Sequence, residues 1–289
     1  LINHLANMKQ RTILLLLFIS SFSYSQNPSY KLFDDSISPI IDKEYDKAKS
    51  LFISLNEEYK VDPNKKKAFC FYALKHDDLD YFKNSMKDLI VNYGYKYSKY
   101  DLSLSLIDTS KLTLTKLLKD NNLENWLFNV SDSLYPIWIK NNPRSFEVKQ
   151  KLREIHTIDQ AMRRGFPEFD SLMWDAIEKK DYQNLKTLFQ LCDSNGVLPN
   201  NFDQGIGSTD WFFIFLHNIK SYQTFEIWEE FEPYLERTYL AGKIDIDCFV
   251  MYDRILAQFY GVQYFGFLED VPIKDEEHLL ERKEKYGFL

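Results

Sequence analysis

Apolar residues recur every three or four positions along most of this chain of 289 residues. That spacing places them on one face of an α-helix. The clearest stretch covers residues 40–59, where the apolar positions are Ile41, Tyr45, Ala48, Phe52, Leu55 and Tyr59. A helix of this kind has an apolar stripe that other helices must cover. The pattern predicts an all-α protein, either a multi-helix bundle or a short array of helical repeats.

Start and stop signals predict where two of the next helices begin and end. Pro63 suits the first position of a helix. The side chain of Asp77 is expected to cap a helix over residues 77–93, which Gly94 then ends. The same periodicity predicts further helices at residues 110–120, 123–140, 144–164, 168–179, 182–194, 209–220, 221–240, 245–260 and 275–286. Pro136 must start, kink or end a helix within its segment.

One stretch does not follow the helical period. Residues 95–108 read YKYSKYDLSLSLID, in which leucines and serines alternate as they do in a strand. One isolated strand cannot form a sheet. We therefore expect at most a minor extended segment that connects helices and lies over them.

The start of the chain has the features of an export signal. Residues 8–25 read MKQRTILLLLFISSFSYS, with two positive charges, an apolar run and small residues at the end. The serines interrupt the apolar run before the roughly 20 residues that a membrane span needs, and Gln26 is not a cysteine that could accept a lipid. We expect residues 1–7 to be an upstream extension. We also expect cleavage after Ser25, export to the periplasm or the medium, and no membrane span in the mature chain.

Composition limits the kinds of partner and cofactor. The formal net charge is −7, and the only dense basic run is Lys65 to Lys67, so no nucleic-acid partner is expected. The sequence has no glycine-rich phosphate loop and no nucleophile elbow, so no cofactor is expected. Three cysteines are too few for a disulfide scaffold, and each lies in an apolar stretch where a buried thiol fits.

A boundary is expected at Asn141, Asn142 and Pro143, the clearest break in the helical pattern. It divides the mature chain into a helical N-terminal region, residues 26–142, and a helical C-terminal domain, residues 143–289. The polar residues that could carry chemistry lie in the second part.

Three predicted helices of the C-terminal part each place a titratable group near the interior. At 100° per residue, Asp159 projects between Leu152 and Ile155 on an apolar face. Asp253 lies at the margin of an apolar face, and Arg254 next to it points elsewhere. His217 ends the strongly apolar run WFFIFLH.

Two interpretations of these groups are open. In the functional one, His156, Asp159, His217 and Asp253 converge in a cleft that separates their pKa values and supplies an acid and a base. In the structural one, the acids pair with Arg163, Arg164 or Arg254 and link helices, because an unpaired buried charge is costly. We favour the structural interpretation. A metal site made by His156, Asp159 and His217 is a third and weaker possibility.

Four short segments are spaced along about residues 153–268, namely IDQAMRR (158–164), GVLP (196–199), FLHN (215–218) and YDRILAQFYGVQYFG (252–266). In their order and spacing, the C-terminal half resembles an uncharacterised bacterial family, domain of unknown function 6624. The resemblance implies no assigned activity, but it singles out Asp159, Gln160, Arg163, His217, Asp253, Arg254, Gln263 and Tyr264. The family pattern continues with Thr-Gln after Gly266, where this chain has Phe267 and Leu268.

The expected function is that of a noncatalytic binding or interaction module for a protein or small-molecule partner. Gln160, Arg163, Gln263 and Tyr264 are the candidate binding residues, the last two on a tight loop between Gly261 and Gly266. The alternative is a hydrolase-like enzyme. In that enzyme Asp159 and Asp253 act as acid and base, while His217 and Arg254 orient groups or stabilise developing charge.

Overall fold

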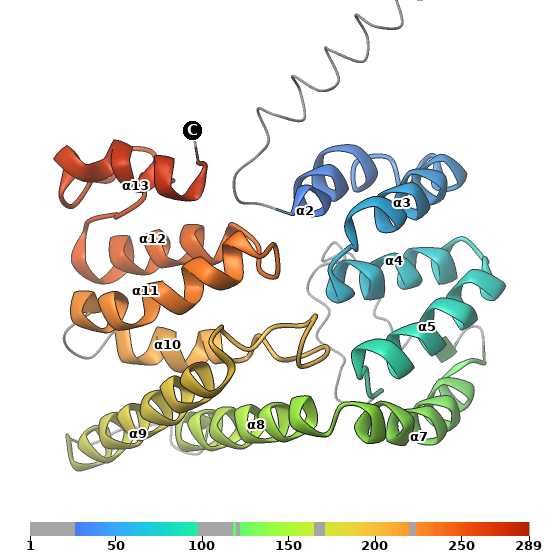
Figure 1. Cartoon of the computed structure of the whole chain (residues 1–289), viewed down its shortest axis with the longest axis horizontal. Helices are drawn as coiled ribbons and strands as arrows, with labels where there is room; N and C mark the ends of the chain where they lie inside the picture. The colour runs from blue at the N-terminus through green and yellow to red at the C-terminus, as the bar shows by residue number, and fades with distance from the viewer. Residues whose placement is uncertain (1–26, 98–117, 120–121, 165–170, 220–223, 289) are drawn as a thin grey trace, which may run out of the picture. The chain divides into compact units, whose positions relative to one another are not determined.

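The computed structural model describes residues 27–97, 118–119, 122–164, 171–219 and 224–288. These residues form helices and connecting loops, with one isolated β-bridge between Gln263 and Ile273. The prediction of an all-α protein is confirmed. Consecutive helices pack side by side, α4 against α5 and α5 against α7 (Figure 1).

The helices of the described chain have the following bounds: α2 (Pro28–Leu32), α3 (Tyr45–Tyr59), α4 (Pro63–Lys75), α5 (Leu79–Tyr93), α7 (Glu124–Asn141), α8 (Pro143–Arg164), α9 (Ser171–Asn195), α10 (Trp211–Ile219), α11 (Thr224–Leu240), α12 (Asp247–Tyr260) and α13 (Leu279–Tyr286). Two short turns accompany them, the π-helical η1 (Phe33–Ile37) and the 3-10 helical η2 (Glu276–His278). None of the described helices combines the length and the apolar character that crossing a bilayer requires.

The chain divides into two compact units. The larger covers residues 28–235, and the described part of the smaller covers Asn27 and residues 236–288. The expected boundary at Asn142 and Pro143 is only the junction of α7 and α8, inside the larger unit. Contacts cross this junction, because the buried Lys149 of α8 donates a hydrogen bond to the carbonyl oxygen of Gly94 at 2.7 Å.

The first helices follow the sequence signals with two shifts. Helix α4 begins at Pro63 as predicted, and the Asp62 carboxylate caps it by accepting from the backbone N–H of Asn64 at 2.7 Å. Helix α3 begins at Tyr45 rather than near residue 40. The cap of α5 is Asp78, which accepts from the backbone N–H of Tyr81, and not Asp77 as predicted. Asp77 takes a left-handed backbone conformation, φ 58°, in the preceding turn.

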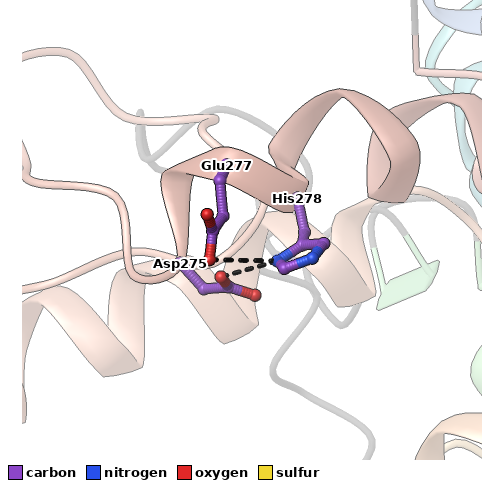
Figure 2. Close-up of side chains that lie close together, drawn as sticks. All are labelled: Asp275, Glu277 and His278. Atoms are coloured by element: carbon purple, nitrogen blue, oxygen red, sulfur yellow. Dashed lines mark hydrogen bonds and ion pairs between the residues drawn. The ribbon is translucent and has the colours of Figure 1, made fainter.

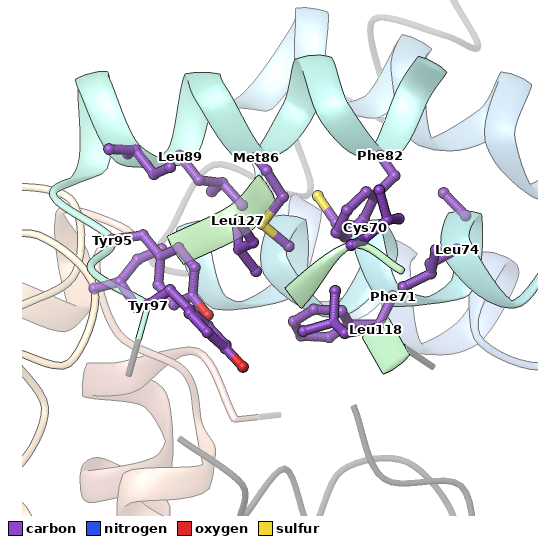
Figure 3. Packing of buried hydrophobic residues seen from close by; sticks show 14 of the residues in the cluster. Cys70, Phe71, Leu74, Phe82, Met86, Leu89, Tyr95, Tyr97, Leu118 and Leu127 are labelled. Atoms are coloured by element: carbon purple, nitrogen blue, oxygen red, sulfur yellow. The ribbon is translucent and has the colours of Figure 1, made fainter. Parts of the chain in front are cut away.

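An apolar core joins α4, α5 and α7. Phe82, Met86 and Leu89 project from α5 toward Cys70 of α4 and Leu127 of α7, and all five are buried (Figure 3). Their spacing of three or four residues along α5 is the stripe that the sequence predicts. Cys192 is buried as well, whereas Cys248 is half-buried, and the three cysteines form no disulfide.

Several predicted boundaries differ in the second half of the chain. The helices expected at residues 168–179 and 182–194 form the single helix α9, because no glycine or proline interrupts the sequence between them. Residues 275–286 divide into η2 and α13. Pro136 and Pro233 lie inside α7 and α11. Most of the expected extended segment and of the helix at residues 110–120 lies outside the described residues, and Tyr95 to Tyr97 do not form a strand.

Candidate functional site

Four charged or titratable side chains meet where α8, α9 and α10 of the larger unit pack on one another. Asp159 and Arg163 come from α8, Asp181 from α9 and His217 from α10. We call these four residues the Asp159 cluster. The three helices approach in Figure 1 at the turn of the chain where α8, α9 and α10 are labelled.

Asp159 has hydrogen bonds to both of its carboxylate oxygens. Its Oδ1 lies 2.8 Å from Nδ1 of His217 and accepts from Nη1 of Arg163 at 2.9 Å, while Oδ2 accepts from Nε2 of Gln160 at 2.8 Å. The side chain of Asp159 has no exposed surface. A buried carboxylate is kept ionised only by such partners, so this aspartate is fully engaged within the protein.

Arg163 links the two acids of the cluster. Besides Asp159, its guanidinium donates through Nη2 to Oδ2 of Asp181 at 2.5 Å. Asn218, next to His217, donates to the backbone carbonyl oxygens of Asp181 and Ile214 at 3.1 and 2.8 Å. One guanidinium, one imidazole and one amide thus connect three helices.

Burial and charge act on the two acids with opposite results. Burial alone would raise the pKa of Asp159, but the hydrogen bond from His217 and the charges of His217 and Arg163 outweigh burial and lower it below its ordinary value. For Asp181 burial is the stronger influence, and it raises the pKa although Arg163 opposes it. Oδ1 of Asp181 has no hydrogen-bond partner among the described residues. The two carboxyls therefore differ in proton affinity while sharing one guanidinium.

Asp181 is not among the residues predicted from the sequence, because residues 180 and 181 were expected to form a turn between two helices. Read as one helix, the same segment places Asp181 between Ile177 and Leu185, four residues from each on a buried stripe. That position carries the same signal that marked Asp159.

His156 does not join the Asp159 cluster. Its Nδ1 lies 3.7 Å from Oδ2 of Asp210, and its ring packs against Phe213 with centroids 5.3 Å apart. Residues three apart lie only about 60° apart around a helix, but the contacts of the His156 ring are with Asp210 and Phe213 and not with Asp159. The predicted metal set of His156, Asp159 and His217 is therefore wrong for the described part of the chain, where the ligand atoms of these three residues do not gather.

A different set brings three potential ligand atoms together. Asp275, Glu277 and His278 lie in and directly before η2, with their ligand atoms within 4.8 Å of one another (Figure 2). All three are exposed, His278 Nδ1 lies 2.7 Å from Oδ1 of Asp275, and Arg282 donates to Oδ2 of Asp275 at 3.1 Å. The hydrogen bond from His278 lowers the pKa of Asp275 and raises that of His278. These contacts are those of a surface ion-pair network that fixes the turn before α13.

Asp253 of α12 organises a loop in the smaller unit. Its Oδ1 accepts from the backbone N–H groups of Tyr264 and Phe265 at 2.7 and 2.9 Å, and its Oδ2 accepts from Phe265 and Phe267 at 3.2 and 3.1 Å. Burial raises the pKa of Asp253, and the backbone amides oppose that rise. Arg254 beside it is exposed, with its nearest polar contact to Met251 Sδ at 3.8 Å.

The candidate binding residues of this loop make structural contacts as well. The Gln263 side chain donates to the carbonyl oxygens of Leu268 and Val271, both at 2.7 Å, and accepts from the N–H of Leu268 at 2.8 Å. The guanidinium of Arg282 lies over the ring of Tyr264, 4.1 Å from its centroid. The loop is thus closed on itself by buried polar side chains.

The sequence-predicted site residues therefore fall into two separate groups. Asp159, Gln160, Arg163 and His217 meet in the larger unit, whereas Asp253, Gln263 and Tyr264 meet in the smaller one. The side chain of Arg164, named as a possible partner of the acids, lies outside the described residues.

Comparisons of the chain with family models, with curated proteins and with solved structures found no match. The resemblance to the uncharacterised bacterial family stays a prediction.

Proposed function

We propose that the protein is an exported, noncatalytic binding or interaction protein in which the buried acids have a structural role. The observation that carries this proposal is the state of Asp159. It is fully enclosed, and both of its oxygens are hydrogen bonded by Arg163, His217 and Gln160. A general acid or base must reach the proton that it transfers, and Asp159 in this arrangement reaches only protein groups.

Asp253 supports the same proposal. Its carboxylate is buried and binds the backbone amides of the loop after α12. A buried carboxylate that accepts hydrogen bonds from several backbone N–H groups stabilises the loop to which those N–H groups belong. Surfaces of packed helices then remain for the recognition of a partner.

A specific observation favours a second candidate function, a hydrolase-like enzyme. Asp159 and Asp181 have pKa values displaced in opposite directions, and His217 contacts Asp159 at 2.8 Å. Two carboxyls with separated pKa values are the arrangement of a catalytic acid and base. For this function the cluster would have to open, because neither carboxyl has substantial exposed surface.

The substitution Asp159→Asn separates the two functions. For a structural role, we expect the free energy of unfolding, measured in urea, to fall by about 3 kcal/mol, because Arg163 then loses a buried partner. Glu154→Gln is the matched control, since Glu154 is an exposed acid on the same helix that pairs with Lys151. The whole chain is also assayed with chromogenic esters, phosphoesters and glycosides. Turnover by the wild type that Asp159→Asn abolishes without loss of stability would contradict the structural role.

The export part of the proposal rests on the sequence pattern of residues 8–25. Expression of the chain from Met8 in a Gram-negative host, followed by N-terminal sequencing of the periplasmic protein, tests it. We expect the mature chain to begin at Gln26. A protein that keeps residues 8–25 and stays in the cytoplasm would contradict export.

A further inference from the structure

A cavity of about 270 Å³ lies between α7 and the first half of α8 in the larger unit. Tyr135 and Ile139 line it from α7, Phe146 and Arg153 line it from α8, and Lys96 lies at its edge. The Asp159 cluster contributes no residue to it. The cavity is therefore a separate feature of this unit.

Tyr135, which lines the cavity, has a hydroxyl group that lacks a hydrogen-bond partner among the described residues. The hydroxyl is buried, and the whole residue is only 5% exposed. The ring cannot turn away easily, because it stacks on Trp138 at 5.5 Å and packs edge-on against Phe146 at 6.4 Å. A buried hydroxyl without a partner is unfavourable by about 1–3 kcal/mol, so a ligand that accepts a hydrogen bond from Tyr135 would remove this cost.

Arg153 gives the cavity an available positive charge. It is half-buried and makes no hydrogen bond or ion pair with any described residue. The ammonium group of Lys96 adds a second positive charge, 5.5 Å from the centroid of the Tyr135 ring and 3.9 Å from the carboxylate of Asp132. In a chain of net charge −7, a wall with two cations and one acid selects for an anionic ligand.

Apart from the amide of Gln150, the remaining walls are apolar. Pro136, Ile139 and Phe146 face the cavity together with the ring of Tyr135. Pockets for drug-sized molecules start at about 300 Å³, so this cavity suits a smaller ligand. Its lining matches an apolar ring or a short chain that carries one acidic group.

We propose that this cavity binds a small carboxylate with an apolar body, whose carboxylate pairs with Arg153 and accepts a hydrogen bond from Tyr135. The guanidinium fork of arginine matches the two oxygens of a carboxylate. The inference rests on the binding function proposed above and names its class of ligand. It does not depend on the Asp159 cluster, so the two proposals can fail independently.

The first test is titration of the whole chain by isothermal calorimetry with four probes. Benzoate and hexanoate combine an apolar body with a carboxylate, benzamide keeps the ring without the charge, and inorganic phosphate keeps a charge without the apolar body. We expect benzoate or hexanoate to bind, benzamide to bind at least tenfold more weakly than benzoate, and phosphate not to bind. Absence of binding by both carboxylates, or equal affinity for benzoate and benzamide, would overturn the proposal.

The second test locates the site. Tyr135→Phe and Arg153→Gln should each weaken binding of the carboxylate about tenfold or more, since a hydrogen bond to a charged group is lost. The fold should tolerate Tyr135→Phe, because the hydroxyl makes no bond within the described protein. Matched controls are Lys151→Gln, an exposed cation on the same helix, and Tyr182→Phe, an exposed tyrosine on α9.

Unchanged affinity is expected in both controls. If Lys151→Gln weakens binding as much as Arg153→Gln, the attraction comes from overall charge and the site is not in the cavity. If carboxylates fail to bind while Asp159→Asn still lowers stability, the ligand class is wrong and the structural role of the acids stands.

Discussion

Nδ1 of His217 lies 2.8 Å from Oδ1 of Asp159, although the two residues are 58 positions apart in the sequence. The contact joins α10 to α8, and the same carboxylate oxygen also accepts from Arg163. The Asp159 carboxylate thus contacts one side chain from α10 and one from its own helix, α8. Its protonation would weaken both contacts at once, which makes the stability of the larger unit dependent on pH.

Stability should fall in acid because of Asp159. The folded-state pKa of Asp159 is lowered from its ordinary value of 3.8. Its contribution to stability is therefore complete above the unfolded-state pKa and is lost as the pH falls through the lower folded-state value. We expect the free energy of unfolding, measured in urea between pH 5 and pH 2.5, to fall less steeply in Asp159→Asn than in the wild type. Equal slopes in the two proteins would contradict this assignment.

Arg163 should be sensitive even to replacement by lysine. Its guanidinium contacts Asp159 through one terminal nitrogen and Asp181 through the other, and a lysine ammonium cannot reproduce this fork. We expect Arg163→Lys to lower the free energy of unfolding by about 2–3 kcal/mol and Arg163→Met by about 3–5 kcal/mol, the usual range for a broken buried pair.

A double-mutant cycle of Arg163→Met with Asp181→Asn isolates the pair between α8 and α9. The coupling energy should exceed about 1 kcal/mol, because the residues are in direct contact. The same cycle between Arg163→Met and Glu154→Gln, an exposed acid on α8, should give no coupling. Equal coupling in the two cycles would contradict a direct role for Asp181.

The sequence predicts local features of this fold well. Helical spacing predicted α5, and the preference of proline for the first helical position predicted the start of α4 at Pro63. Both signals depend only on neighbouring residues. The cap of α5 was placed one residue early, since Asp77 and Asp78 are both good caps and only the turn geometry decides between them. Asp181 was missed because a turn was expected at residues 180 and 181, where α9 continues as a helix.

The sites depend on contacts that spacing cannot supply. The pairing of Asp159 with Arg163 follows from a separation of four residues on one helix. Its pairing with His217 depends on how α8 and α10 pack, and the spacing of residues along one helix does not determine this packing. The partners of Asp253 are backbone amides of a returning loop, and no residue type indicates them. Tyr135 and Arg153 carry no sequence signal of a site, because both fit the helical pattern of α7 and α8.

Asp253→Asn should loosen the loop that follows α12. In the wild type, the backbone N–H groups of Tyr264, Phe265 and Phe267 donate to the carboxylate of Asp253. The replacement puts an NH₂ group, which is itself a donor, in the place of one carboxylate oxygen. We expect the free energy of unfolding to fall by about 2–3 kcal/mol. In hydrogen exchange, the amides of these three residues should exchange faster. Glu269→Gln, which changes an exposed acid in the same loop, is the control and should leave both measurements unchanged.

Gly94→Ala should cost far more than the usual glycine replacement. Gly94 ends α5 with φ 58°, and a Cβ atom there would lie 2.5 to 2.7 Å from three ring atoms of Trp138. The left-handed conformation alone costs a residue with a side chain about 1 kcal/mol. The clash adds to this cost, because Trp138 is packed between Tyr135 and Phe146 and cannot move freely.

Gly196→Ala separates the two contributions to that cost. Gly196 has φ 74° with no atom within 4 Å of the added Cβ, so only the backbone contribution applies. We expect Gly196→Ala to lower the free energy of unfolding by about 1 kcal/mol and Gly94→Ala to lower it by about 3 kcal/mol or more. Similar losses in the two variants would mean that Trp138 does not press on the end of α5. The same tryptophan supports the ring of Tyr135, so Gly94→Ala should also weaken benzoate binding, whereas Gly196→Ala should not.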